Sequence, residues 1–292
     1  MKPIRSFLFI PGDSEKKIAK ADATGADAII FDLEDAVAMD NKAAARKLTA
    51  AALADRPPGK RVCQLWVRIN PMDSGMAKDD LAAIIAGQPD GIMLPKANSP
   101  ADVATLSQWL DAMEMESELD TGSVKILPLT TETAIAPFYL GEYASAGLTR
   151  LYGLTWGAED LAAALGASTN LGADGTWAFT YKMVRSMCLM AAHASGVEAV
   201  ETVYVDFRDS EGLRTACLAA RSEGFSGRMA IHPAQVPVIN EAFTPSEKEV
   251  AHAARVVAAF ADNPGSGVVG LDGKMLDVPH LKAAQRVLAQ AE

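Results

Sequence analysis

A short apolar run followed by an amphipathic helix recurs eight times along this chain, and this alternation restricts the fold more than any other feature. The runs predict strands at 6–10, 28–31, 64–69, 91–94, two within 125–161, 202–205 and 228–231. Strands that alternate with helices at this spacing form a parallel sheet covered by helices. Eight such units closing on themselves predict an α/β fold of the (β/α)8 TIM-barrel type. A doubly wound open sheet is the alternative, but no glycine-rich dinucleotide fingerprint follows the first run.

The last fifty residues do not fit this repeat. A (β/α)8 barrel routinely fills a chain of 292 residues as one domain. We expect a barrel domain over residues 1–243 and a C-terminal helical extension over 244–292. The extension opens on Ser246 and Glu249, which have the spacing of a capping box. Because a barrel closes without it, we expect the extension to be a lid or a contact with a neighbouring subunit.

Composition excludes several classes of protein. A net charge of −10 argues against nucleic acid as the main partner, since phosphate binding needs concentrated Lys and Arg. No apolar stretch approaches the roughly 18 residues of a membrane span, so we expect no membrane partner. The first twelve residues hold only a short apolar run before a charged helix, and we expect no signal peptide. The cysteines are few and scattered, which favours reduced thiols and a cytoplasmic protein: Cys63, Cys188 and Cys217.

Charged or polar side chains follow nearly every predicted strand, at the end where barrel enzymes carry their catalytic groups. These residues are Asp32, Glu34, Asp35, Arg68, Asn70, Lys96, Glu132, Asp160, Asp206 and His232. Surface loops are polar as well, so the collective pattern counts for more than any single residue. It predicts an active site at the carboxyl ends of the strands.

Glu132 and Asp160 each follow an apolar run and precede a helix-forming segment. If the two runs are neighbouring parallel strands, both carboxylates lie at one end of the sheet. Mg²⁺ selects oxygen ligands from one or two carboxylates and keeps several waters for substrate. The pair therefore suggests a magnesium site. The alternative is that each carboxylate only stabilises the N-terminus of its helix.

Arg68 is unusual because it lies within an apolar strand, where an unpaired charge is costly. An arginine that faces carboxylates or an anionic substrate at the barrel mouth resolves that cost. A structural ion pair with Asp32 or Asp35 is the alternative. His232 is either a base or, more commonly for such a histidine, a hydrogen-bonded support. The motifs of zinc proteases, serine hydrolases and P-loop kinases are absent from the sequence.

Ten ordered motifs carry a resemblance to a known family. They are RSFLFIPG at 5–12, GADAIIFDLEDAV at 25–37, VRIN at 67–70, LPK at 94–96, TETA at 131–134, GAED at 157–160, TVYVDFRDSEGL at 202–213, GFSGRMAIHPAQV at 224–236, TPSEKEV at 244–250 and GKMLDVPHLKAAQ at 273–285. The chain resembles the citrate lyase beta subunit-like family of the HpcH/HpaI aldolase superfamily along its whole length. The resemblance implies a barrel that is usually trimeric and acts on CoA thioesters or acyl-carrier thioesters.

The resemblance also implies an activity. Members cleave or form the carbon–carbon bond of 3-hydroxyacyl thioesters of the malyl, citramalyl or citryl type, giving an acyl thioester and an oxo acid. We expect a Mg²⁺-dependent carbon–carbon lyase that uses an acyl-CoA. The alternatives are a citryl-carrier lyase subunit of a citrate lyase complex, or a malate synthase-like or thioesterase activity. A non-catalytic CoA-binding relative is a further class, against which the retained site residues argue.

Roles for individual residues follow from the matching motifs. The resemblance implies that Glu132 and Asp160 hold Mg²⁺ and that Arg68 contacts the reacting oxo acid. It implies that Asp277 is delivered from the extension into a neighbouring subunit of a homotrimer, where it transfers a proton. Asp35 is implied to orient Arg68 or a metal-bound water.

The implied substrate contacts extend to both ends of the thioester. Arg5 and Lys16 match positions near the CoA phosphates. Backbone N–H groups of Ala158, Glu159 and Asp160, which open a helix, are suited to the substrate carboxylate. Two departures from the family pattern, Thr130 and Glu201, suggest an altered substrate pocket.

Overall fold

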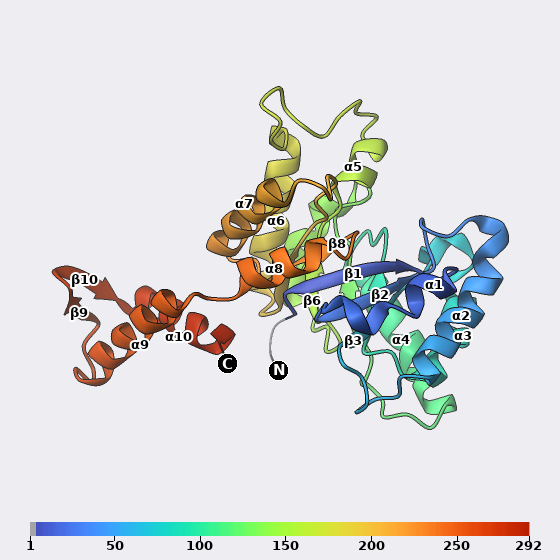
Figure 1. Cartoon of the computed structure of the whole chain (residues 1–292), viewed down its shortest axis with the longest axis horizontal. Coiled ribbons are helices and arrows are strands. Elements are labelled where there is room, and N and C mark those ends of the chain that lie inside the picture. Colours follow the sequence, from blue (N-terminus) through green and yellow to red (C-terminus); the bar gives the residue numbers. More distant parts are fainter. Residues whose placement is uncertain (1–3, 292) are drawn as a thin grey trace.

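The computed structural model describes residues 4–291, and its centre is a barrel of eight parallel strands (Figure 1). The strands are β1 (Ser6–Pro11), β2 (Ala28–Asp32), β3 (Gln64–Arg68), β4 (Gly91–Leu94), β5 (Lys125–Pro128), β6 (Gly153–Thr155), β7 (Glu198–Glu201) and β8 (Gly227–Ala230). Their order in the sheet is β5-β4-β3-β2-β1-β8-β7-β6.

The two ends of this sheet, β5 and β6, meet and close the barrel. The Ile126 amide donates to the Arg150 carbonyl at 2.8 Å, and the Tyr152 amide donates to the Ile126 carbonyl at 2.9 Å. Parallel bridges join Ile126 to Leu151 and Leu129 to Thr155. The predicted barrel is therefore confirmed over the open-sheet alternative.

Helices cover the outside of the barrel (Figure 1). The α-helices are α1 (Glu15–Ile18), α2 (Lys42–Ala54), α3 (Ala77–Ile84), α4 (Pro100–Glu116), α5 (Ala158–Ala164), α6 (Phe179–Ala194), α7 (Ser210–Glu223) and α8 (Gln235–Phe243). Shorter 3₁₀ segments are η1 (Ala21–Thr24), η2 (Met39–Asn41), η3 (Met72–Ser74), η4 (Ile85–Gly87) and η5 (Ala136–Ser145). Ser99 caps α4 by accepting a hydrogen bond from the Ala101 amide, as predicted.

The strands read as continuous apolar runs because both of their faces are buried. In β2, Ala28 and Ile30 belong to the cluster that fills the barrel, whereas Ile29 and Phe31 pack in the larger cluster that includes the helices. Side chains alternate along a strand. The next inward position after Ile30 is therefore Asp32, so the same alternation that builds the core sends a carboxylate into the barrel mouth.

One predicted strand is in the wrong place. The β-branched and aromatic residues at 202–205 predicted the seventh strand, but β7 ends at Glu201 and Thr202 begins a loop. Tertiary packing outweighs strand propensity here, because Ala199 and Val200 are the residues that fit the core. Asp206 consequently lies exposed in a loop, and the carboxylate at the end of β7 is Glu201.

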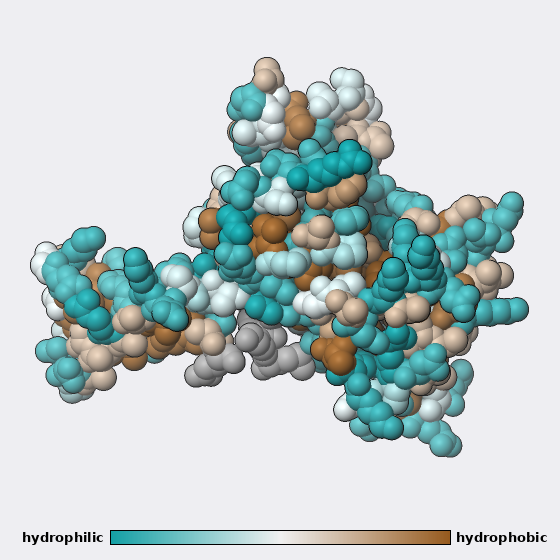
Figure 2. Space-filling view, in the orientation of Figure 1, coloured by the Kyte–Doolittle hydropathy of each residue, from teal (hydrophilic) through white to brown (hydrophobic). Residues whose placement is uncertain are grey.

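After α8 the chain forms α9 (Glu247–Ala261), the antiparallel strands β9 (Val268–Leu271) and β10 (Lys274–Asp277), and α10 (Val278–Ala291). The predicted capping box of Ser246 and Glu249 opens α9. These elements share an apolar cluster of their own. They form a lobe beside the barrel, joined to it by a narrow neck (Figures 1 and 2). Across residues 4–291, no helix has the length and apolarity to cross a bilayer.

Candidate active site

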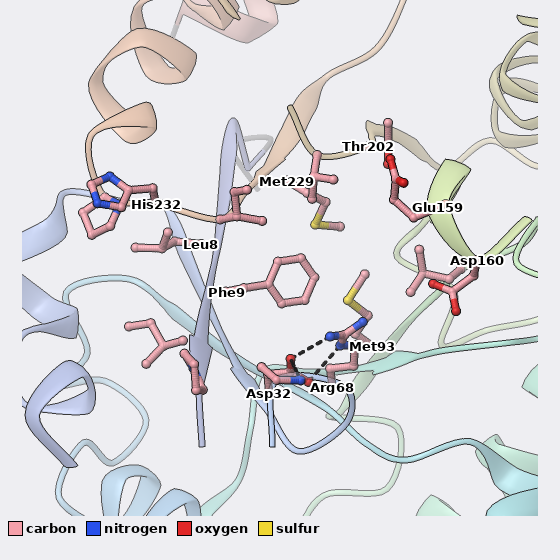
Figure 3. Close-up of a pocket in the computed structure, with 18 of the residues that line it drawn as sticks. Leu8, Phe9, Asp32, Arg68, Met93, Glu159, Asp160, Thr202, Met229 and His232 are labelled. Atoms are coloured by element: carbon pink, nitrogen blue, oxygen red, sulfur yellow. Dashed lines mark hydrogen bonds and ion pairs between the residues drawn. The ribbon is translucent and has the colours of Figure 1, made fainter. Parts of the chain in front are cut away.

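A cavity of about 530 Å³ opens at the carboxyl ends of the strands (Figure 3). Its apolar floor comes from inward residues of several strands, including Phe9 of β1 and Met93 of β4. Its polar groups are Asp32, Arg68, Glu132, Glu159, Asp160 and Thr202, with Lys17, Lys20, Thr24 and His232 also lining it. A concave, largely apolar pocket with a few convergent charges is the usual form of a small-molecule site.

Arg68 is held at the centre of this cavity by a bidentate ion pair. β2 and β3 pair in a register that sets Asp32 beside Arg68. The Nε atom donates to Asp32 Oδ1 at 2.8 Å and Nη2 donates to Oδ2 at 2.6 Å, as Figure 3 shows. Nη1 lies 2.8 Å from Glu34 Oε2, and the guanidinium stacks over the Phe9 ring at 4.8 Å. Burial opposes the charge of Arg68, but Asp32 and Glu34 raise its pKa overall.

The predicted ion pair between Arg68 and Asp32 is present, and the paired guanidinium still lines the cavity, so a contact with substrate stays a prediction. Asp35 was predicted to orient Arg68 or a metal-bound water; its contact with Arg68 is absent, and its role toward a metal-bound water stays a prediction. Asp35 points toward solvent, with its side chain 61% exposed, and its carboxylate lies 3.6 Å from the Lys96 ammonium. Asp32 and Glu34 orient Arg68 instead.

Lys96 connects Glu34, which follows β2, to the two predicted magnesium ligands, Glu132 and Asp160. Its ammonium contacts Glu34 and lies 3.4 Å from Asp160 Oδ1. Its backbone N–H donates to Glu132 Oε2 at 2.6 Å. Its φ of 51° lies in the left-handed region, which is uncommon for a residue other than glycine and often marks a functional site. Lys96 therefore contributes both its side chain and its strained backbone to the site.

Glu132 is almost completely buried and lies beside a second negative charge. Burial, and then the nearby Asp160 carboxylate, raise its pKa to about 8. Gly157, which precedes α5, packs against it, and a Cβ added to Gly157 would lie 2.9 Å from Glu132 Cγ. Thr131 Oγ1 accepts a hydrogen bond from the Gly157 amide at 3.0 Å. The ends of β5 and β6 are thus closely fitted together where the two acids project.

The N-terminus of α5 faces the same cavity. Ala158, Glu159 and Asp160 all line it, and the N-cap residue Gly157 provides no side-chain cap. The first N–H groups of a helix have no partner within the helix. The Glu159 carboxylate accepts from Asn170 Nδ2 at 2.8 Å, so its side chain is already engaged. A ligand at the N-terminus of α5 can therefore contact mainly the backbone N–H groups of this segment and the Asp160 carboxylate.

The charges at the mouth do not balance. The carboxylates of Asp32, Glu34, Glu132 and Asp160 gather around only two contacting cations, Arg68 and Lys96, so acidic groups outnumber the basic groups that touch them. Buried charges are costly unless they are paired. No group of three or more His, Cys, Asp or Glu within residues 4–291 forms a metal site. Two carboxylates with water in the remaining positions suit Mg²⁺.

Besides Asp35, three further predicted site residues lie outside the lining of this cavity. Arg5 precedes β1, at the opposite end of the barrel, and its guanidinium is paired with Asp27 at 2.8 Å. Lys16 is exposed on α1, but Lys17 and Lys20 line the cavity in its place. Asp277 lies in the lobe at the end of β10, half exposed, with a hydrogen bond to His280 that lowers its pKa.

Several cavity residues were missed in the sequence. Lys17 and Lys20 follow the first strand at a spacing of three, which sets them on one face of a short helical segment and could have indicated them. Phe9 and Trp156 read as core residues and gave no separate signal.

His232 lines the cavity and stacks on Phe207 with ring centroids 4.6 Å apart. The Ala234 amide donates to its Nδ1, which makes His232 a hydrogen-bonded residue, as the more conservative interpretation predicted.

Comparison with known proteins agrees with this architecture. A family model described as HpcH/HpaI aldolase/citrate lyase matches residues 5–233. The chain belongs to this family. The resemblance inferred from the ten motifs is therefore confirmed.

Relatives within the family have several names. The chain is 37% identical to a (3S)-malyl-CoA thioesterase of Cereibacter sphaeroides, covering 99% of this chain and 95% of that protein. It is 33% identical to the citrate lyase subunit beta of Haemophilus influenzae, covering 100% and 98%. It is 32% identical to the mitochondrial citramalyl-CoA lyase of Rattus norvegicus, covering 99% and 86%.

Solved structures of the family resemble this one closely. The protein CitE of Mycobacterium tuberculosis, in complex with magnesium, acetoacetate and coenzyme A, gives a TM-score of 0.77 at 37% identity, covering 99% of this chain and 98% of that one. A citrate lyase beta subunit of the same organism, complexed with oxaloacetate and magnesium, gives 0.67 at 38% identity, covering 83% and 98%.

The two departures from the family pattern are not pocket residues. Thr130 and Glu201 are buried and do not line the cavity. Thr130 Oγ1 donates to the Thr155 carbonyl at 3.0 Å, and Glu201 accepts from the Trp156 indole at 2.6 Å. Both support the end of β6, so any effect that they have on the pocket is indirect, and an altered substrate pocket stays a prediction.

We predict that Glu132→Gln removes a pH-dependent loss of stability in the metal-free protein. Folded Glu132 keeps its proton up to about pH 8, whereas the ordinary pKa is 4.5. Between these values the unfolded state binds fewer protons than the folded state, so the stability of the wild type falls as pH rises. Glutamine cannot ionise, so the variant's advantage in thermal stability should be larger at pH 8.5 than at pH 5.

The measurement is thermal unfolding of both proteins in EDTA at the two pH values. Glu114→Gln is a matched control, because Glu114 is as deeply buried but Arg150 and backbone amides lower its pKa despite that burial. An advantage for Glu132→Gln that is the same at both pH values would contradict the raised pKa.

Proposed function

We propose that this protein is a Mg²⁺-dependent carbon–carbon lyase that cleaves a 3-hydroxyacyl-CoA thioester into an acyl-CoA and an oxo acid. The observation that supports this most strongly is the convergence of Glu132, Asp160 and Arg68 in one cavity. Two of the relatives are named lyases, and two structures of relatives contain magnesium together with an oxo acid. The substrates implied are malyl-, citramalyl- or citryl-CoA.

Glu132 and Asp160 are the residues that would hold Mg²⁺. When bound, the ion supplies a Lewis acid and template for the hydroxyl and carboxylate of the oxo-acid half. The backbone N–H groups of Ala158 and Glu159 bind the same carboxylate from the N-terminus of α5. Arg68, fixed by Asp32 and Glu34, directs at the reacting oxygen the N–H groups that these two carboxylates leave over.

Cleavage requires a proton to leave the hydroxyl and a proton to be delivered to the acyl carbon. As the Cα–Cβ bond breaks, its electron pair becomes the enolate of the acyl thioester, and the alkoxide becomes the carbonyl of the oxo acid. We assign the base to Asp277 of a neighbouring subunit, whose lowered pKa keeps it ionised at neutral pH. The same carboxyl group then returns the proton to the enolate carbon.

This assignment gives the C-terminal lobe its role. We propose that residues 1–243 form the catalytic barrel and that residues 244–292 deliver Asp277 to a second copy, within a homotrimer. Asp277 does not line the cavity of its own chain, and the lobe lies beside the barrel rather than over its mouth. The active site is then shared between subunits.

The three unpaired cysteines support a cytoplasmic location.

Lys17 and Lys20 are the better candidates for the CoA phosphates. They lie at the rim of the cavity, whereas Arg5 is committed to Asp27 at the opposite end of the barrel. Two ammonium groups at one rim suit a diphosphate. The CoA chain would then enter beside α1, with the acyl group directed toward Arg68.

A thioesterase is the second candidate function. The relative that is 37% identical along nearly the whole chain is named a (3S)-malyl-CoA thioesterase. The same residues that stabilise an enolate can hold a thioester for attack by water. A citryl-carrier lyase subunit is a further alternative, which the name of the citrate lyase subunit beta supports.

The deciding experiment incubates the purified protein and Mg²⁺ with malyl-, citramalyl- and citryl-CoA. Lyase activity releases an oxo acid together with an acyl-CoA, whereas thioesterase activity releases free CoA and a hydroxy acid. We expect the oxo acid and the acyl-CoA to form in equal amounts with one of the substrates. Free CoA as the first product would favour the thioesterase, and no turnover of any substrate would contradict a stand-alone enzyme.

A second part of this assay tests whether the active site is shared between subunits. Asp277→Asn and Asp160→Asn should each be inactive alone, because one lacks the base and the other lacks a metal ligand. Refolding the two variants together should restore part of the activity, since some sites then combine an intact Asp160 with an intact Asp277. Failure to complement, with mixed oligomers present, would contradict donation between subunits.

We predict that replacing Lys17 and Lys20 by alanine raises KM for the CoA thioester by about tenfold, the loss of two modest ion pairs, with little change in kcat. The N-acetylcysteamine thioester of the same acyl group lacks the phosphates and should be unaffected. Lys16→Ala is the matched control, on the same helix but outside the cavity. Equal effects of the control and the double variant would contradict the assignment.

A further inference from the structure

The carboxylate of Glu201 joins four groups from four segments around the end of β7. It is 1% exposed. Oε1 accepts from Trp156 Nε1 at 2.6 Å and from the Thr202 amide at 2.9 Å. Oε2 accepts from Arg185 Nε of α6 at 2.6 Å and lies 3.7 Å from Arg228 Nη2 of β8. A buried carboxylate with this many partners holds the segments that carry them in one arrangement.

Glu201 acts where the backbone pairing of β6 stops. The last register pair between β6 and β7 joins Thr155 to Val200. β6 is only three residues long, and Trp156 follows it directly. The hydrogen bond from the Trp156 indole to Glu201 therefore continues the connection between the strands by one residue. The Trp156 ring is fully buried, and its single polar atom has Glu201 as its acceptor.

Trp156 leads straight into the segment that carries Asp160. On the side of β5, Thr131 Oγ1 binds the Gly157 amide at 3.0 Å, and Gly157 packs against Glu132. On the side of β7, Glu201 holds Trp156. The segment 156–160 is thus fixed from both sides, and the separation of Glu132 from Asp160 depends on both contacts.

We propose that Glu201 is a positioning residue, which sets Asp160 against Glu132 through its hydrogen bond to Trp156. It touches neither the cavity nor the reacting atoms. The inference rests on the proposed function, because it assigns these two carboxylates to a divalent cation. Groups that orient metal ligands from behind commonly change metal affinity ten- to a hundredfold when they are removed.

Glu201→Gln tests this with little change of shape. Its single amide oxygen can accept from Arg185 or from Trp156 but not from both, and the charged guanidinium is the stronger donor, so the NH₂ group faces the indole N–H and the contact with Trp156 is lost. Trp156→Phe removes the indole donor and leaves the carboxylate and both arginines in place. Glu114→Gln is the matched control. Glu114 is another fully buried glutamate, and it pairs with Arg150 next to the start of β5, at the opposite end of the barrel.

The readout is Mn²⁺ affinity by EPR titration without substrate, together with kcat, KM and the melting temperature. We expect Glu201→Gln and Trp156→Phe to weaken Mn²⁺ binding at least tenfold and to lower kcat more than they raise KM. We expect Glu114→Gln to lower the melting temperature while Mn²⁺ affinity stays at the wild-type value. A merely structural role for Glu201 would make the two glutamine variants behave alike.

Each of the other outcomes overturns a stated part of the inference. Wild-type Mn²⁺ affinity and kcat in a folded Glu201→Gln protein overturn the inference and leave the proposed function standing. If Glu201→Gln does not fold, Trp156→Phe decides in the same way. Weak Mn²⁺ binding in Glu201→Gln with normal binding in Trp156→Phe overturns the route through the indole. No Mn²⁺ binding in the wild type overturns the cation site itself, and with it this inference.

Discussion

The burial of Glu132 beside Asp160 is the constraint on which the site depends. A carboxylate that is 5% exposed, next to another negative charge, remains protonated up to about pH 8 unless a positive charge reaches it. Arg68 is already balanced by Asp32 and Glu34, and Lys96 is shared between Glu34 and Asp160. The surrounding barrel therefore favours a divalent cation at the mouth. The packing of Gly157 and the hydrogen bonds of Thr131 and Glu201 fix where that cation would lie.

Much of the fold could be predicted because the barrel needs both faces of its strands buried. Continuous apolar runs such as that of β2 are typical of strands in a parallel sheet, and helix caps such as Ser99 depend on local chemistry. The seventh strand could not be predicted in the same way. Thr202 and its neighbours have the higher strand propensity, but Ala199 and Val200 fit the core. Which of two adjacent segments is buried depends on contacts distant in sequence.

The residues of the candidate site also fall into two groups, those that local sequence predicts and those whose role depends on the folded structure. Asp32, Arg68, Glu132 and Asp160 could be found because each ends an apolar run, and strand order then brings them together. Residues whose role depends on side-chain direction could not. Asp35 and Lys16 point outward, whereas Glu34 and Lys17 beside them point toward the site or its rim. One position along a turn or a short helix reverses direction, and sequence spacing alone does not resolve it.

Calorimetric titration of Mg²⁺ into the wild type at pH 7, in buffers of different ionisation enthalpy, tests the central claim most directly. Glu132 must lose its proton when the cation binds, because its pKa in the free protein is about 8. We expect one ion per chain, close to one proton released, and no release in Glu132→Gln. Binding that releases no proton in the wild type, or that is unchanged in both Glu132→Gln and Asp160→Asn, would contradict a cation site built on this pair.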